Sequence, residues 1–169
     1  MANTYVLISS ATVGAGGTSS IDFTSIPATY TDLLIEGSLR TDEAATFSYS
    51  FMTFNNTNTG YSSKWLYGNG SAAGSTSFST AQTMDIDAAN NTANTFTNFA
   101  IYVPNYSGSS NKSYFIDSAM EQNGTTAYAE LIAGLWSNTS AINRVTFTLS
   151  STFKYAQNST VYLYGIKNS

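Results

Sequence analysis

The sequence predicts an all-β fold, a single antiparallel β-sandwich of jelly-roll-like type with about ten strands. Runs of β-branched and aromatic residues recur along the chain, bounded by Gly, Asn, Ser and Pro. Several of these runs alternate apolar and polar residues, as half-buried antiparallel strands do. No segment shows a helical period, so two packed sheets are the simplest way to bury the apolar faces.

The expected strands follow one another without a shift in composition, which indicates one domain over residues 1–169. A Gly-rich turn at 14–17 separates the first two strands, and Asn123-Gly124 is typical of a hairpin turn. Pro104 closes a strand, because proline donates no ladder hydrogen bond. The predicted strands are 4–13, 20–26, 30–41, 46–55, 76–86, 95–104, 112–122, 126–137, 142–152 and 159–167.

Alternation also predicts which side chains share a face of a sheet. Three such sets are Phe47, Tyr49 and Phe51; Phe99, Ile101 and Val103; and Val145, Phe147 and Leu149. Large apolar residues in these patterns are expected in the core, namely Phe23, Phe47, Phe99, Trp136 and Phe147.

Two segments are predicted to be loops, the longer at 56–75 and a purely polar one at 87–95. The longer segment carries Tyr61, Trp65 and Tyr67 outside any strand pattern. Aromatic side chains in a loop indicate either a contact surface or a loop that folds back over the end of the sandwich. If they form a contact surface, we expect these three residues to touch a neighbouring subunit more readily than a sugar.

Charge is sparse, since only 9% of residues are charged and the net charge is −4, from 10 acidic and 6 basic residues. Binding of nucleic acid or of an anionic membrane needs a basic patch, and the sequence has none. We therefore expect neither as a partner. A low charge suits a protein that packs against copies of itself.

The chain contains no Cys and no His, which excludes disulfides, thiolate chemistry and Ser–His or Cys–His catalysis. The apolar run near the start, Tyr5 to Ile8, is too short for a signal peptide or a membrane span. We expect synthesis in a cytoplasm without export by the usual route.

Carboxylates offer the remaining route to chemistry, because a glycosidase works with two of them. Sequence spacing alone does not show which two acidic residues lie close together in the fold. Glu130 lies among apolar neighbours, which favours a partly buried, paired carboxylate over a catalytic one. Asp85 and Asp87 share one face of a strand end, where they are either solvated or bind a cation with Asn90 or Asn91.

Two Gly-rich segments, 14–17 and 68–74, resemble phosphate-binding loops only superficially, because no helix follows either of them. They are predicted to be turns. The sequence thus assigns no catalytic, cofactor-binding or metal-binding residue, and no cofactor.

Two signatures near the ends of the chain resemble small β-sandwich proteins encoded in the structural modules of tailed bacteriophages. The first follows the pattern I-x-F-x-x-I-P-x-x-Y-x-x-L, and the second is a Trp followed by a terminal L-Y-G-I-K. Together with a looser match in the middle, they span nearly the whole chain. The matching residues are Ile21, Phe23, Ile26, Pro27, Tyr30 and Leu33, then Trp136, Leu163, Tyr164, Gly165, Ile166 and Lys167.

This resemblance implies a non-enzymatic virion protein, made in the host cytoplasm. The first expectation is a capsid decoration (cement) protein on the head surface; the alternative is a receptor- or glycan-binding tail-fibre tip module. An enzyme such as a polysaccharide hydrolase is a third hypothesis. The implied partners are further copies of the chain, as a homotrimer, and the major capsid protein or a tail protein, with a host surface glycan as a possible ligand. The resemblance brings no catalytic residues.

Overall fold

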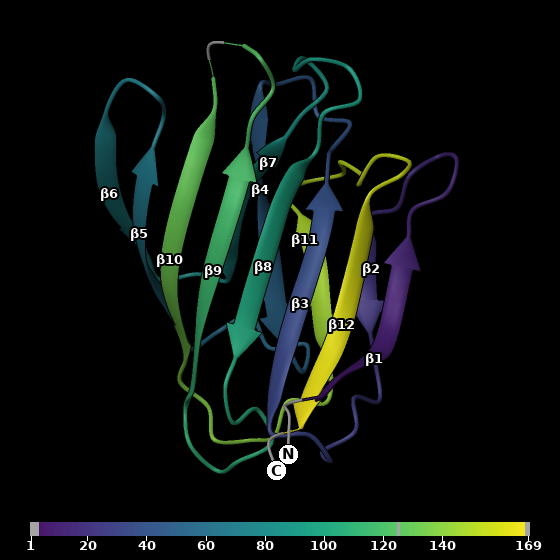
Figure 1. Cartoon of the computed structure of the whole chain (residues 1–169), viewed down its shortest axis with the longest axis vertical. Coiled ribbons are helices and arrows are strands. Elements are labelled where there is room, and N and C mark those ends of the chain that lie inside the picture. Colours follow the sequence, from purple (N-terminus) through teal and green to yellow (C-terminus); the bar gives the residue numbers. More distant parts are fainter. Residues whose placement is uncertain (1–3, 125, 168–169) are drawn as a thin grey trace.

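The computed structural model describes residues 4–124 and 126–167, and within them every regular element is a β-strand. Twelve strands in this described part form two antiparallel sheets that pack face to face (Figure 1). The larger sheet has the order β1-β12-β3-β8-β9-β10-β5-β6, and the smaller sheet has the order β2-β11-β4-β7. The all-β sandwich predicted from the sequence is confirmed.

The strand bounds are as follows. They are β1 Thr4–Thr12, β2 Ser20–Phe23, β3 Asp32–Leu39, β4 Phe47–Phe54, β5 Tyr61–Gly68, β6 Ala73–Phe78, β7 Gln82–Asp87, β8 Thr97–Val103, β9 Lys112–Met120, β10 Tyr128–Trp136, β11 Val145–Leu149 and β12 Thr160–Lys167.

Strands that are distant in sequence lie side by side, which gives the jelly-roll-like character. The last strand, β12, pairs with both β1 and β3, and β11 lies between β2 and β4. The chain therefore crosses repeatedly between the two layers. Over the residues described, no helix is long and apolar enough to cross a membrane.

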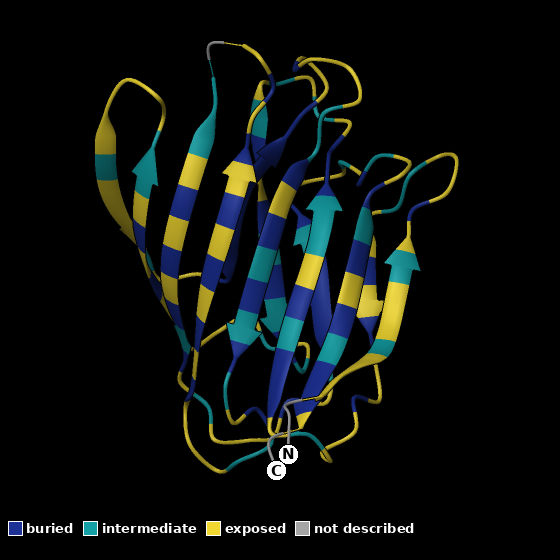
Figure 2. Cartoon of the chain, viewed as in Figure 1, coloured by how far each residue is buried: buried dark blue, intermediate teal, exposed yellow. Residues whose placement is uncertain are grey.

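The core lies between the sheets and is formed by alternate residues of their facing strands (Figure 2). In β9, for example, every second side chain is buried and the others are exposed. Four of the predicted core residues, Phe23, Phe99, Trp136 and Phe147, are buried as expected. The fifth, Phe47, is only half-buried, because it is the first residue of β4 and lies on the face of that strand that points away from the core.

Two strand predictions are wrong. The predicted strand 76–86 is two strands, β6 and β7, joined by a turn that contains no Gly, Pro or Asn to mark it. The predicted loop 56–75 contains β5, which occupies an interior position of the larger sheet between β10 and β6. The connection between β9 and β10 is also longer than the tight turn that Asn123-Gly124 predicts, although Asn123 does adopt a left-handed φ of 56°.

The faces of β4 are opposite to those predicted. Ser48, Ser50, Met52 and Phe54 point inward and are buried, whereas Phe47 and Phe51 are half-buried and Tyr49 is 39% exposed. The buried Ser50 hydroxyl is satisfied by a 2.9 Å hydrogen bond with the Tyr155 hydroxyl. Because Met52 and Phe54 complete the core from this strand, the aromatic set faces outward.

Candidate functional site

A cleft opens where the larger sheet extends beyond the smaller one. The smaller sheet ends at β7, which packs against β8, β9 and β10, so β5 and β6 project past it. The cleft encloses about 250 Å³ between β4 and β7 on one side and β5, β6 and β10 on the other. Its lining residues are Phe47, Tyr49, Trp65, Tyr67, Thr76, Phe78, Asp85, Tyr128 and Glu130.

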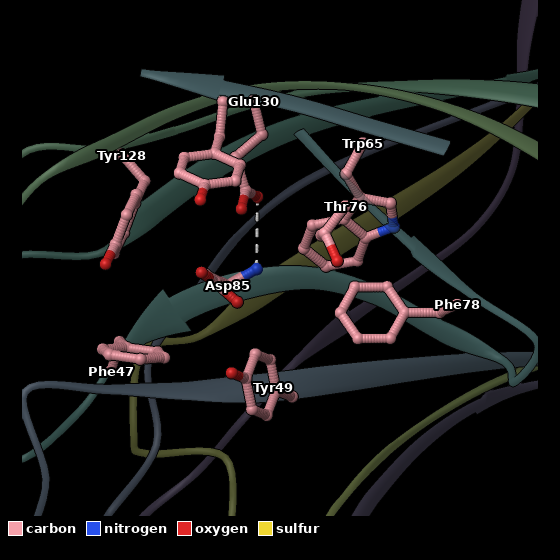
Figure 3. Close-up of a pocket in the computed structure, with 9 residues that line it drawn as sticks. Phe47, Tyr49, Trp65, Thr76, Phe78, Asp85, Tyr128 and Glu130 are labelled. Atoms are coloured by element: carbon pink, nitrogen blue, oxygen red, sulfur yellow. Dashed lines mark hydrogen bonds between the residues drawn. The ribbon is translucent and has the colours of Figure 1, made fainter. Parts of the chain in front are cut away.

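Aromatic rings that contact one another form the walls of the cleft (Figure 3). Phe47 packs edge-on against Tyr49 and Tyr128, with ring centroids 5.7 and 5.6 Å apart. On the larger sheet, Tyr67 of β5 packs against Tyr128 of β10, with ring centroids 6.0 Å apart. These edge-to-face contacts are the arrangement that aromatic pairs prefer, and they hold the rings in fixed orientations.

The wall at Tyr67 depends on a glycine of the edge strand. Gly74 of β6 pairs with Tyr67 of β5, and a Cβ atom at Gly74 would lie only 2.5 Å from the tyrosine ring. A larger residue at this position would therefore displace the ring. Trp65 and Phe78 form the far end of the cleft, with ring centroids 4.9 Å apart.

Two carboxyl groups lie at the floor of this aromatic cleft. Asp85 of β7 is 8% exposed and Glu130 of β10 is 3% exposed. Glu130 Oε2 accepts hydrogen bonds from the Ser118 hydroxyl at 2.7 Å and from the Asp85 backbone N–H at 3.2 Å. The Asp85 and Glu130 carboxyl groups lie close enough for each to alter the pKa of the other.

Burial raises the pKa of Asp85 to about 8, with a further contribution from the charge of Glu130. Burial also raises the pKa of Glu130, although the hydrogen bonds that it accepts from Ser118 and from Asp85 oppose the change. The two groups titrate as a pair that holds a proton at pH values where isolated carboxyls are ionised. The pKa values of Tyr49 and Tyr128 are raised too, chiefly by burial and then by Asp85, so both hydroxyls stay neutral donors.

One oxygen of the pair has no protein partner. Asp85 Oδ1 is buried and accepts no hydrogen bond from any residue that the structure describes. Buried polar atoms are usually paired, so an orphaned carboxyl oxygen in a cleft marks a place for a ligand.

The three aromatic residues selected from the sequence lie on β5, so the prediction that they occupy a loop is wrong. Tyr61 is 4% exposed and stacks on Trp136 in the core, where burial raises its pKa to about 12. Trp65 is 3% exposed and donates from Nε1 to Ser63 Oγ at 2.8 Å. Trp65 and the half-buried Tyr67 do line the cleft; Tyr61 does not.

Glu130 is more deeply buried than the sequence predicts, and its partners are the Ser118 hydroxyl and the Asp85 backbone N–H rather than a basic side chain. Asp85 and Asp87, which the sequence suggests as joint ligands of a cation, have different neighbours in the structure. Asp87 accepts a hydrogen bond from Asn91 Nδ2 at 2.5 Å and shapes the following loop. In the part of the chain that the structure describes, no group of three or more acidic, His or Cys side chains could hold a metal ion.

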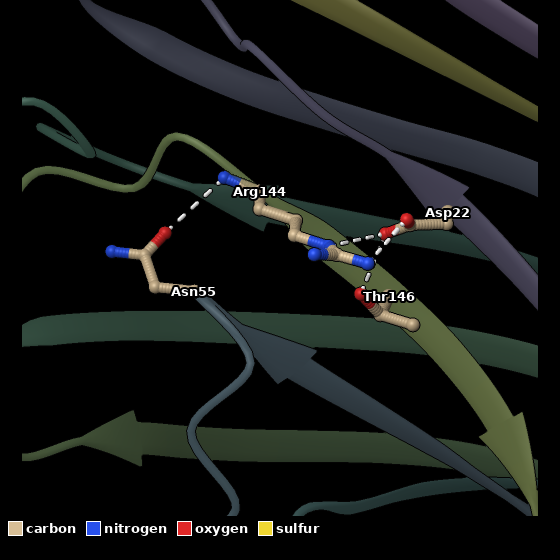
Figure 4. A network of polar contacts seen from close by, with 4 residues as sticks. All are labelled: Asp22, Asn55, Arg144 and Thr146. Carbon is tan, nitrogen blue, oxygen red and sulfur yellow. Dashed lines mark hydrogen bonds and ion pairs between the residues drawn. The ribbon is translucent and has the colours of Figure 1, made fainter.

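A second polar cluster has a structural role (Figure 4). Arg144 forms an ion pair with Asp22 at 2.6 Å, which together with the hydrogen bond from Thr146 lowers the Asp22 pKa against the effect of burial. Asn55 accepts hydrogen bonds from the backbone N–H groups of Asn143 and Arg144. These contacts join the end of β4 to the start of β11.

The outer face of the larger sheet carries exposed apolar residues on the opposite side of β5 and β10 from the cleft. We call Leu66, Phe115 and Leu131 the apolar strip; they are 62%, 52% and 58% exposed. Leu131 of β10 pairs directly with Leu66 of β5, and Phe115 lies one strand away on β9. Lys64 and Asp117 project from the same face on either side of the strip.

No protein-family model matches the chain, and no curated protein sequence matches it. Among solved structures, the galectin LEC-6 of Caenorhabditis elegans is similar over 94% of this chain and 96% of its own, at 8% sequence identity and a TM-score of 0.32. This likeness is too remote to carry an argument about ligand or role.

Proposed function

We propose that this chain is a non-enzymatic surface protein of a tailed-phage virion that binds a host surface glycan in its cleft. The observation that carries the proposal is the aromatic cleft with an unpartnered, buried carboxyl oxygen at its floor. Sugar rings stack their C–H faces on aromatic side chains, while carboxyl oxygens accept hydrogen bonds from sugar hydroxyls. The cleft therefore favours the second of the two virion roles that the resemblance implies.

The volume of the cleft supports a small ligand group. At about 250 Å³, it is smaller than the roughly 300–1,000 Å³ of pockets that enclose drug-sized ligands. One terminal ring of a longer chain fits this space, while the rest of the glycan extends outward over the β5–β6 hairpin.

The geometry of the carboxyl pair supports binding rather than hydrolysis. Retaining glycosidases hold their carboxyl groups about 5–5.5 Å apart and inverting enzymes about 6.5–9.5 Å apart, with the scissile bond between them. Asp85 and Glu130 do not lie on either side of an open space in this way, since the Asp85 backbone N–H donates directly to Glu130 Oε2 at 3.2 Å.

A glycan array probed with the purified protein tests this proposal, using Tyr49→Ala as the cleft variant. Tyr162→Ala is the matched control, because Tyr162 is 38% exposed, close to the 39% of Tyr49, and lies on β12 away from the cleft. We expect retention of particular glycans by the wild type and by Tyr162→Ala, with a loss of about tenfold or more for Tyr49→Ala. An array without any retained glycan, or equal retention by both variants, would reject the proposal.

Capsid decoration is the second candidate function, and the apolar strip favours it. Contiguous exposed apolar residues commonly mark protein interfaces. Lys64 and Asp117 on opposite sides of the strip allow two copies of the chain to pair with opposite charges in contact. We therefore assign the strip to contacts between neighbouring copies, with the homotrimer implied by the resemblance as the expected assembly.

Analytical ultracentrifugation of the wild type and of Leu131→Glu tests this second candidate, together with binding to isolated capsids. Decoration predicts an oligomer that the glutamate converts to a monomer, and a gain in capsid heat resistance only with the wild type. A wild-type monomer that leaves capsids unchanged would exclude it. Tyr49→Ala serves as the control, because Tyr49 lies on the other sheet.

A further inference from the structure

The carboxyl pair in the cleft has no basic side chain beside it to compensate the negative charge that the pair acquires when it loses a proton. No lysine or arginine is present among the described residues that line the cleft. Two other basic residues have partners elsewhere: Arg40 donates to backbone carbonyls of the 88–95 loop, and Lys64 donates to Ser77 on the outer face. A buried charge without a partner is costly, so a compensating ligand group is expected.

The unpartnered oxygen provides a specific place for that group. Asp85 Oδ1 has no hydrogen-bond donor among the described residues, although Asp85 is more than nine-tenths buried. Figure 3 shows the Asp85 carboxyl among the cleft rings, between Glu130 and Tyr49. A donor on a ligand that entered from solvent would meet this oxygen at the floor of the cleft.

The walls select an organic cation over a metal ion. Tyr49, Tyr67, Tyr128 and Trp65 present π-systems, which attract ammonium groups placed near their faces. Calcium takes six to eight oxygen ligands, whereas this cleft is mostly aromatic. A neutral sugar would stack on the same rings but would leave the carboxylate charge unopposed.

We propose that the glycan group bound in the cleft carries an organic ammonium, as an amino sugar or a choline-substituted sugar does, and that the Asp85–Glu130 pair is its counterion. This inference rests on the proposed glycan-binding function and specifies its ligand class. The aromatic rings then position the cation. Asp85 Oδ1 accepts a hydrogen bond from a primary ammonium, or lies close to the positive charge of a quaternary one.

Calorimetric titration with two pairs of probes tests the inference. Choline is compared with its neutral isostere 3,3-dimethylbutan-1-ol, and glucosamine with N-acetylglucosamine, at pH 7. We expect each charged probe to bind at least about tenfold more tightly than its neutral counterpart. Equal affinities within either pair would overturn the inference.

The double variant Asp85→Asn, Glu130→Gln keeps the shape of the floor and removes its charge. We expect it to bind choline and the isostere with affinities within about twofold of each other. Asp117→Asn is the control, because it removes a carboxylate from the outer face and should leave the preference intact. A double variant that folds and still prefers choline would contradict the assignment of the counterion.

A pH series on the wild type keeps the test valid if the double variant fails to fold. The titratable groups that face the site are Asp85 on β7, Glu130 and Tyr128 on β10, Tyr49 on β4 and Tyr67 on β5. Choline is charged at every pH, so its affinity should rise from pH 5 to pH 9 as the carboxyl pair loses its proton. A flat profile would overturn the inference.

The glycan array separates failure of this inference from failure of the proposed function. Retention of neutral glycans together with no preference for choline would overturn the ammonium ligand and keep glycan binding. An array without any retained glycan would overturn the function itself.

Discussion

The ring of Tyr30 lies so close over Gly165 that a Cβ atom on this glycine would lie 2.3 Å from Cγ of the tyrosine. The contact joins the two end signatures of the chain, because Tyr30 precedes β3 and Gly165 lies in β12, which pairs with β3. The backbone reinforces it, since Thr31 N–H donates to the Ile166 carbonyl at 2.8 Å. The absence of a side chain at Gly165 in the last strand thus leaves the space that the Tyr30 ring of the first signature occupies.

Gly165→Ala is therefore expected to destabilise the fold. Overpacking of this kind costs about 1–3 kcal/mol, and each kcal/mol lowers the Tm by about 2–4 °C for a chain of this length. Thermal unfolding followed by circular dichroism measures the change. Gly68→Ala is the control, because nothing lies within 4 Å of a Cβ at that position. A similar Tm for both variants would show that the Tyr30 ring adjusts without cost.

The carboxyl pair makes stability depend on pH in a defined direction. Burial raises the Asp85 pKa from 3.8 to about 8, so between these values the folded chain holds a proton that the unfolded chain releases. The stabilisation is complete below pH 3.8 and is lost as the pH rises through about 8. We expect the Tm to fall over this range in the wild type and to fall less in Asp85→Asn. Parallel pH profiles of the two proteins would refute the assignment.

Asp22 provides a contrast of opposite sign. Its pKa is lowered, chiefly by the hydrogen bond from Arg144, so its contribution is present above pH 3.8 and is lost below it. The effects of the two aspartates on the pH profile therefore lie in separate ranges. We expect Asp22→Asn to lower the Tm above pH 3.8, where the wild type has the ion pair, and to approach the wild-type Tm at more acidic pH.

Asn55 fixes the entry into β11 with its side-chain amide. It accepts from the N–H groups of Asn143 and Arg144 at 2.9 and 3.2 Å and donates to the Ala141 carbonyl at 2.8 Å. We expect Asn55→Ala to cost about 1–3 kcal/mol, measured by urea denaturation, because it leaves these backbone groups without their partner.

Asn56→Ala is a matched control for this prediction. Asn55 and Asn56 have left-handed φ values of 52° and 56°, so the backbone strain that alanine introduces is similar at both positions. The difference between the two variants then measures the hydrogen bonds of Asn55. Equal destabilisation would assign the whole effect to the backbone.

Arg40 organises the polar loop that the sequence places at 87–95. Its guanidinium donates to the carbonyls of Thr92, Thr95 and Asn91 at 2.8, 2.9 and 3.1 Å. A lysine keeps the charge but lacks the planar fork of donors. We expect Arg40→Lys to increase amide hydrogen exchange at 88–95 by about tenfold or more, as measured by mass spectrometry. Unchanged exchange, matching that of a Lys64→Ala control, would show that the loop is ordered without Arg40.

Periodicity predicted the strands well, but it did not predict the phase of β4. Both sets of alternate residues in that strand are partly apolar, so alternation alone could not decide whether Tyr49 or Met52 faces the core. Burial resolves it, since Met52 is fully buried and Tyr49 is exposed. The reversed phase is also what brings Phe47 and Tyr49 to the cleft.

β5 was not predicted because the alternation of apolar and polar residues along it is broken at two positions. Ser63 faces inward, where it accepts the Trp65 Nε1–H, and Leu66 faces outward. The proximity of Asp85 to Glu130 could not be predicted from the sequence, for a different reason. Asp85 and Glu130 are 45 residues apart and on different sheets, so only the packing of the two layers places them together.

The unequal width of the two sheets has a consequence for how this protein evolves. The cleft lies beneath an overhang formed by the β5–β6 hairpin, outside the layer where both sheets pack. Its tip at 69–72 is exposed, and changes in its length would leave the central packing intact. Insertions and substitutions at this margin are therefore expected to change the shape of the cleft entrance while the sandwich persists.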